Sequence, residues 1–362
     1  QSPTLYRGPE SYIPPTRPTS CVTSVSHYPH TAAAHTLSTL SIMIVNIPTS
    51  ADFERLADDC LNQAFDLIFE TDKYIFNHPG AERKDEVWAY SHGKLNTAVV
   101  LMHQAIEALM KASICSISPL LLLEGKRTEW PVMPQQKDKD FNDFYTTPAE
   151  ALMHTYAATA STKLDEAVIK HIDEMRRLRN QIVHGISTTK LSPRALIAGI
   201  LNTYLFFRGK DVWWESLLKG HMSNPLTLNY SLAREVAEFA ERLEYVRAYL
   251  GKSSLAKHFA LNISGRAYYC PWCKQAWEED IKLDAYEHKW AFLKPNKPAA
   301  TTVQCLNCGI DSDVCREPCS EGCSGNVVYY GETPEDIICL TCGRMQFDRS
   351  LEGELVQGEP QS

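Results

Sequence analysis

The sequence predicts a mainly α-helical protein that ends in a small, cysteine-rich zinc-ribbon domain. Two observations predict this fold class. Apolar residues recur with a period of about 3.6 residues through much of the first two thirds of the chain, and nine of the 12 cysteines lie between Cys270 and Cys342. We therefore divide the chain into an N-terminal extension (1–48), a helical bundle (49–250) and a zinc-ribbon module (251–362).

The extension differs in composition from everything that follows it. Residues 1–42 are rich in Ser, Thr and Pro and poor in large apolar side chains, and the first methionine is Met43. Such a segment has too little apolar surface to bury. We expect residues 1–48 to be a disordered or non-native extension.

The bundle is expected to begin with an amphipathic helix over 52–76. Thr49 and Asp52 have the spacing of a capping box at its start, and the turn sequence at 77–80 ends it. A second helix is predicted over 95–115. Its apolar positions surround most of its circumference, which is typical of a helix at the centre of a core.

The remaining helices follow a long connection. Residues 116–146 carry no clear period, and so long an insertion suggests a mobile or functional element. Thr147-Pro148 begins a short helix, and amphipathic helices are predicted over 164–184, from Ser192-Pro193 to Phe207, and over 231–250. No strand-like alternation occurs in this part of the chain.

Paired cysteines dominate the C-terminal module. Cys270-Pro-Trp-Cys273 and Cys305-Leu-Asn-Cys308 form two C-x-x-C pairs that together supply the four tetrahedral ligands of one zinc ion. The third pair, Cys339-Leu-Thr-Cys342, needs two more ligands from Cys315, Cys319 and Cys323. We favour the last two because Ser320-Glu321-Gly322 makes a compact loop between them. The predicted ligands are Cys270, Cys273, Cys305, Cys308, Cys319, Cys323, Cys339 and Cys342.

Both zinc ions are expected to be structural, because four thiolates leave no open position for a substrate. Each site carries a net charge of about −2, which adds to an already acidic module. This disfavours a DNA-binding regulator and favours a surface that senses a ligand or binds a protein partner. The C-x-x-C pattern without a convincing secretory signal indicates zinc in a reducing, cytoplasmic compartment rather than disulfides.

The overall charge and hydropathy exclude two other classes. The chain has 36 basic and 44 acidic residues and a net charge of −8, so it is not a protein that coats nucleic acid through bulk charge. The most apolar stretch is interrupted by His103, Glu107 and Lys111. We therefore expect no transmembrane helix and no membrane partner.

The end of the 164–184 helix carries the residues with the clearest chemical potential. Arg179 and Asn180 precede His184 in the pattern R-N-x3-H. Imidazole exchanges a proton near neutral pH, and guanidinium offers a planar fork to phosphate oxygens. Together they suffice for RNA cleavage without a metal. One histidine cannot easily act as both base and acid, whereas two copies across a two-fold axis can.

These residues resemble the HEPN superfamily, whose members are helical bundles with an R-x(4–6)-H motif that often begins Arg-Asn. The resemblance rests on residues 178–185 and on the helix at 105–112, and it covers roughly residues 50–250. It implies a metal-independent endoribonuclease that works as a homodimer on an RNA substrate, with Arg179, Asn180 and His184 in a composite catalytic site. It also implies a role as a toxin or antiviral-defence effector, and Glu107 as a loosely assigned auxiliary residue.

The chain departs from some family members at one position. Those toxins carry a Tyr two residues after the motif histidine, where a partner enzyme modifies them, and here this residue is Ile186. Control by that modification is therefore not expected, and the zinc module is the alternative source of control. The other hypothesis that the sequence leaves open is a non-catalytic HEPN dimerisation or adaptor protein with a structural zinc ribbon.

Overall fold

A computed structural model describes most of the chain after its first 43 residues. The described ranges are 44–78, 84–132, 136–161, 163–185, 191–225, 231–280, 286–331 and 337–346. The expected extension therefore lies outside the described residues, except for 44–48. That short segment belongs to the folded unit, because Ile44 is buried and strand β1 (Ile44–Val45) pairs with β2 (Lys139–Asp140).

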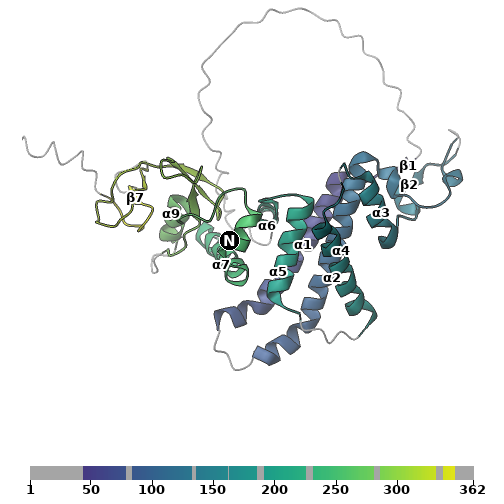
Figure 1. Cartoon of the computed structure of the whole chain (residues 1–362), viewed down its shortest axis with the longest axis horizontal. Helices are drawn as coiled ribbons and strands as arrows, with labels where there is room; N and C mark the ends of the chain where they lie inside the picture. The colour runs from purple at the N-terminus through teal and green to yellow at the C-terminus, as the bar shows by residue number, and fades with distance from the viewer. Residues whose placement is uncertain are drawn as a thin grey trace, which may run out of the picture. The chain divides into compact units, whose positions relative to one another are not determined.

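The structure is mainly helical, which confirms the predicted class (Figure 1). The helices are α1 (Ser50–Asn77), α2 (Lys84–Ile117), α3 (Ala149–Thr159), α4 (Glu166–His184), α5 (Pro193–Phe207), α6 (Val212–Met222), α7 (Leu232–Leu250), α8 (Lys252–Leu255) and α9 (Pro271–Asp280).

The predicted start of the first helix is confirmed at its N-cap. The Thr49 hydroxyl accepts a hydrogen bond from the Asp52 backbone N–H at 3.3 Å, and the Asp52 carboxylate accepts one from the Thr49 backbone N–H at 2.9 Å. Each satisfies a donor that the first helical turn leaves without an intrahelical partner. Pro193 likewise begins α5, and Gly251 ends α7 with a positive φ of 78°.

Helix α2 lies at the centre of the bundle, as the sequence predicted, and packs against α1, α3 and α4. It begins at Lys84, well before the predicted residue 95. The apolar period did not reveal this start because the first turns are polar and largely exposed. Among the described helices, α2 alone is long and apolar enough to cross a membrane, and 67% of its most apolar window is buried inside the protein.

Two segments differ from the prediction. The described residues of the connection 116–146, for which the sequence showed no period, include short 3₁₀ turns, and Leu122 and Phe141 are buried in a core shared with α2 and α4. Helix α6 was not predicted. It is only 11 residues long and follows Asp211, whose φ is 68°, and so short a segment carries little periodic signal.

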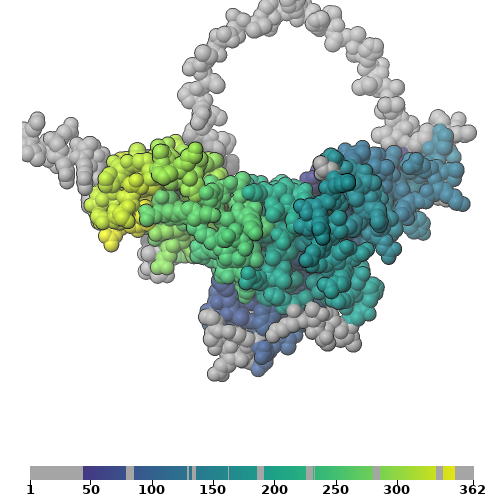
Figure 2. Space-filling view, in the orientation of Figure 1, coloured from purple at the N-terminus to yellow at the C-terminus, as the bar shows by residue number. Residues whose placement is uncertain are grey.

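The C-terminal module combines the short helices α8 and α9 with small antiparallel ribbons. Strands β3 (Ala291–Leu293), β4 (Thr302–Cys305) and β5 (Asp311–Asp313) form one sheet, in the order β3-β4-β5. Strands β6 (Val328–Tyr329) and β7 (Ile338–Cys339) form another. The described residues of this module are drawn in green to yellow in Figure 2.

The sequence border at residue 250 does not divide the main core. Three ribbon residues, Trp290, Phe292 and Leu306, belong to the same buried cluster as the bundle helices. The Trp214 indole N–H of α6 donates to the Leu306 carbonyl oxygen, and the Asn307 amide of the ribbon donates to the Val236 carbonyl oxygen of α7 at 2.9 Å. The second cysteine pair of the first site is therefore inserted between α6 and α7.

Candidate functional site

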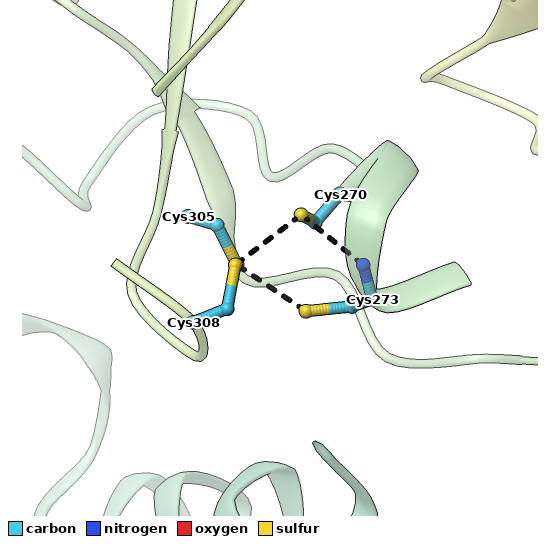
Figure 3. Close-up of side chains that lie close together, drawn as sticks. All are labelled: Cys270, Cys273, Cys305 and Cys308. Carbon is cyan, nitrogen blue, oxygen red and sulfur yellow. Dashed lines mark hydrogen bonds between the residues drawn. The ribbon is translucent and has the colours of Figure 1, made fainter. Parts of the chain in front are cut away.

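The structure brings the eight predicted zinc ligands together as two groups of four thiols. One group is Cys270, Cys273, Cys305 and Cys308, and the other is Cys319, Cys323, Cys339 and Cys342. Within each group all four sulfur atoms lie within 4.8 Å of one another. In Figure 3 the first group converges from the start of α9 on one side and the end of β4 on the other.

The sulfur–sulfur distances fit a zinc tetrahedron. In the first group, the Cys270 and Cys308 sulfurs are 3.6 Å apart and those of Cys273 and Cys305 are 3.8 Å apart. In the second group, the Cys319–Cys342 and Cys323–Cys339 distances are 3.8 and 3.7 Å. Four Zn–S bonds of about 2.3 Å in a tetrahedron separate the sulfurs by about 3.8 Å, whereas a disulfide requires about 2.0 Å. Both groups are therefore compatible with structural zinc sites.

The same local turn builds one half of each site. Gly309 follows Cys308 and Gly343 follows Cys342, with φ of 74° and 78°, a region that a side chain disfavours. Their backbone N–H groups donate to the carbonyl oxygens of Cys305 and Cys339 at 2.9 and 2.7 Å. This closes each C-x-x-C-G segment into a tight loop, so that both thiols point to one side.

The two sites differ in their surroundings. Cys270, Cys273 and Cys305 are at most 2% exposed, and the Asn307 amide nitrogen lies 3.8 Å from the Cys273 sulfur while it also donates to α7. This amide links the first thiol group to the bundle. In the second group, Cys323 and Cys342 are only half-buried.

Cys315, the alternative ligand, is exposed and belongs to neither group. Its backbone pairs with Val328, the first residue of β6. The preference for Cys319 and Cys323 over Cys315 is therefore consistent with the geometry.

The R-N-x3-H residues lie at the C-terminal end of α4. The Arg179 guanidinium donates to the Asn180 side-chain oxygen at 2.9 Å, so these two side chains meet on the helix surface. Asn180 and His184 are exposed, one turn apart. Among the described contacts none joins His184 to Arg179, and Ile186 lies outside the described residues.

Arg179 also lines a pocket of about 290 Å³ between α1, α2 and α4. His103, Glu107 and Lys111 of α2 line the same pocket. Glu107, the loosely assigned auxiliary residue, is therefore placed beside Arg179. Its carboxylate lies 3.7 Å from the Nδ1 atom of His103, whose side chain is 11% exposed.

The pocket keeps its histidine uncharged. Burial lowers the pKa of the His103 imidazole, Glu107 opposes this shift, and the positive charges of Arg179 and Arg176 lower the pKa further. Near neutral pH, His103 is thus a neutral ring that can both donate and accept a hydrogen bond.

The R-N-x3-H motif gives no role to His103 and Lys111, although the sequence carries a signal for them. His103, Glu107 and Lys111 are spaced by four residues on an otherwise apolar helix, which places them on one face. In the sequence they interrupt an apolar run, and the structure shows that this face adjoins Arg179.

Comparison with known proteins gives no relative from which a role could be transferred. The chain matches no protein-family model, no curated protein and no solved structure.

Proposed function

We propose that this protein is a metal-independent endoribonuclease of the HEPN type, in which Arg179, Asn180 and His184 from two subunits form one composite site. The observation that supports the proposal is the exposed R-N-x3-H face at the end of α4, with Arg179 held against Asn180 at 2.9 Å. An arginine and a histidine that solvent reaches on one helix end are accessible to a chain as large as RNA.

The proposed reaction uses the 2′-hydroxyl of RNA as the nucleophile. The imidazole of one subunit takes the 2′ proton while the 2′-oxygen forms a bond to phosphorus. The bond from phosphorus to the 5′-oxygen breaks, and the imidazolium of the other subunit gives its proton to that oxygen. The products are a 2′,3′-cyclic phosphate end and a 5′-hydroxyl end, so atoms and protons balance without a metal.

The other two side chains have supporting roles. The Arg179 guanidinium stabilises the additional negative charge on the phosphorane oxygens. Asn180 accepts a hydrogen bond from Arg179, which leaves its amide N–H groups to bind substrate and limits the freedom of the guanidinium.

In this proposal the zinc module does not take part in the chemistry. Its thiol groups have the donor set of structural sites. Its acidic ribbons are proposed to bind a protein partner or a ligand trigger that controls the bundle. A toxin or antiviral-defence effector in the cytoplasm is the matching biological role.

The test is RNA cleavage in magnesium-free buffer with EDTA, with zinc content measured after the reaction. We expect wild-type protein to leave 2′,3′-cyclic phosphate ends. His184→Ala and Arg179→Ala should lower the rate about a hundredfold or more. Arg177→Ala and His154→Ala are matched controls, since both residues are exposed, and they should keep wild-type activity.

Two outcomes would reject the enzyme. Either wild-type protein cleaves none of the RNA offered, or all four variants cleave as the wild type does. A protein that still forms dimers under those conditions would fit the non-catalytic adaptor instead. In cells, growth arrest on expression that disappears with His184→Ala favours the nuclease, and equal behaviour of the two favours the adaptor.

A further inference from the structure

The pocket beside Arg179 has the charge of a site for an anion. Arg179 and Lys111 supply two positive charges, and Glu107 supplies one negative charge. Glu107 lies near His103, and among the described residues no carboxylate forms an ion pair with Lys111. With His103 neutral, the pocket carries a net charge of +1.

The shape of the pocket also fits a group that enters from solvent. Its volume of about 290 Å³ exceeds what a phosphate group fills, and α1 closes one wall with the apolar side chains of Phe53 and Leu56. A largely apolar wall strengthens the attraction between the cations and a bound anion. Lysine and arginine are the usual protein groups for phosphate oxygens.

Arg179 connects this pocket with the R-N-x3-H face. Its side chain lines the pocket, and one of its nitrogens donates to Asn180 on the exposed surface. His184 lies five residues further along α4, a rise of about 7.5 Å. An RNA strand that binds Arg179 can thus place one phosphate in the pocket and another near His184.

We propose that the pocket binds a backbone phosphate of the RNA adjacent to the cleaved linkage, with Lys111 and Arg179 as cations and His103 as a hydrogen-bond donor. This inference rests on the proposed function, because the ligand is the same RNA. It adds a binding subsite within one subunit, separate from the imidazole that transfers protons.

Phosphate in this pocket has an electrostatic consequence that can be measured. The groups that face His103 are Glu107 and Lys111 from α2 and Arg176 and Arg179 from α4, whereas α1 contributes apolar side chains. An added anion offsets the arginines and favours the imidazolium. The pKa of His103 should therefore rise when RNA binds.

The experiment measures binding of a short single-stranded RNA to full-length His184→Ala protein by fluorescence anisotropy over a range of salt concentrations. Lys111→Gln in this background should weaken binding about tenfold and reduce the slope of log affinity against log salt by about 0.7. Lys94→Gln, an exposed lysine on the same helix, should change neither. Thermal unfolding of each variant confirms that it folds.

A second measurement does not depend on removing a side chain. NMR titration of labelled histidine should show a higher pKa for His103 with RNA than without it. His103→Gln keeps an amide donor and should weaken binding less than Lys111→Gln does. Inorganic phosphate alone should bind far more weakly than the RNA.

The outcomes separate this subsite from the proposed enzyme. An unchanged salt slope in Lys111→Gln, an unchanged pKa of His103, or inorganic phosphate that binds as tightly as the RNA would each overturn the subsite. If wild-type protein cleaves RNA under those results, the nuclease stands without the subsite. If it cleaves nothing although the slope and the pKa change as expected, the subsite stands and the nuclease fails.

Discussion

Truncating one leucine in each zinc loop tests whether the first loop belongs to the helical core. Leu306 and Leu340 occupy the same position in Cys305-Leu-Asn-Cys308 and Cys339-Leu-Thr-Cys342. Leu306 is 7% exposed and packs in the cluster of bundle helices. Leu340 is 0% exposed and packs in a second cluster, which consists of residues of the C-terminal module together with Val236 of α7. The two substitutions therefore have the same chemistry in different cores.

The expected cost of Leu306→Ala follows from its burial. Leucine-to-alanine changes in a core reduce the free energy of unfolding by about 2–5 kcal/mol, and the slight exposure of Leu306 places it near 3 kcal/mol. For a folded unit of roughly 300 residues, that lowers the midpoint of thermal unfolding by about 5 °C. The hydrogen bonds of the Leu306 backbone to Trp290 and Trp214 remain.

The assay follows two signals on heating, helical circular dichroism and zinc release to a coloured chelator. Leu306→Ala should shift the helical transition by the full amount. Leu340→Ala should release zinc at a lower temperature while the helical transition shifts by less than half as much. Equal shifts of the helical transition in both variants, or none in Leu306→Ala, would refute the view that only the first loop is a part of the bundle core.

Three further predictions concern zinc, pH and helix capping. Removing zinc with a strong chelator should lower the helical unfolding midpoint as well as loosen the ribbons, because metal binding to such sites contributes folding free energy; an unchanged midpoint at zero zinc content would contradict the shared core. Burial lowers the pKa of His171 from 6.5 to about 4, so between these values the unfolded chain binds more protons and stability falls as the pH is lowered, by up to about 3 kcal/mol. In denaturant unfolding at several pH values, the free energy of unfolding should fall less at low pH for His171→Gln than for wild type. Parallel curves of this free energy against pH for the two proteins would contradict a neutral buried imidazole. Thr49→Ala should lower the free energy of unfolding by about 1 kcal/mol because it removes the N-cap. Thr97→Ala removes only a hydrogen bond to the carbonyl oxygen four residues earlier, and it should leave this free energy nearly unchanged in the same denaturation assay.

The sequence could predict those elements whose signal is local. The capping box at Thr49, the proline that begins α5 and the glycine that ends α7 are all short-range patterns, and each is found where it was expected. The start of α2, all of α6 and the short helices α8 and α9 of the C-terminal module were missed. The first turns of α2 have no apolar stripe, and α6 is defined by tertiary packing of Trp213 and Trp214 rather than by its period.

Local sequence signals also predicted the metal ligands, but they did not predict how the zinc module packs against the helical bundle. Thiol spacing selects zinc ligands because one tight turn presents two of them, and this is local information. That Leu306 and Asn307 are inserted between α6 and α7 depends on contacts between residues far apart in the chain. Hydrophobic periods and residue spacings report only on neighbours in the sequence, so they could not predict those contacts. The border near residue 250 therefore marks a change in amino-acid composition, while the hydrophobic core continues across it.

For the R-N-x3-H residues, the positions on a helical wheel do not show which groups the side chains contact. A helical wheel places Asn180 and His184 on one face and leaves Arg179 about 140° from His184. The side chain of Arg179 contacts Asn180 on the helix surface and also lines the pocket that contains His103. One subunit thus has a buried imidazole in the pocket of Arg179 and an exposed imidazole five residues further along α4. Only the exposed ring can meet the equivalent ring of a second subunit without opening the core. The proposed chemistry therefore needs a dimer, while the proposed phosphate subsite does not.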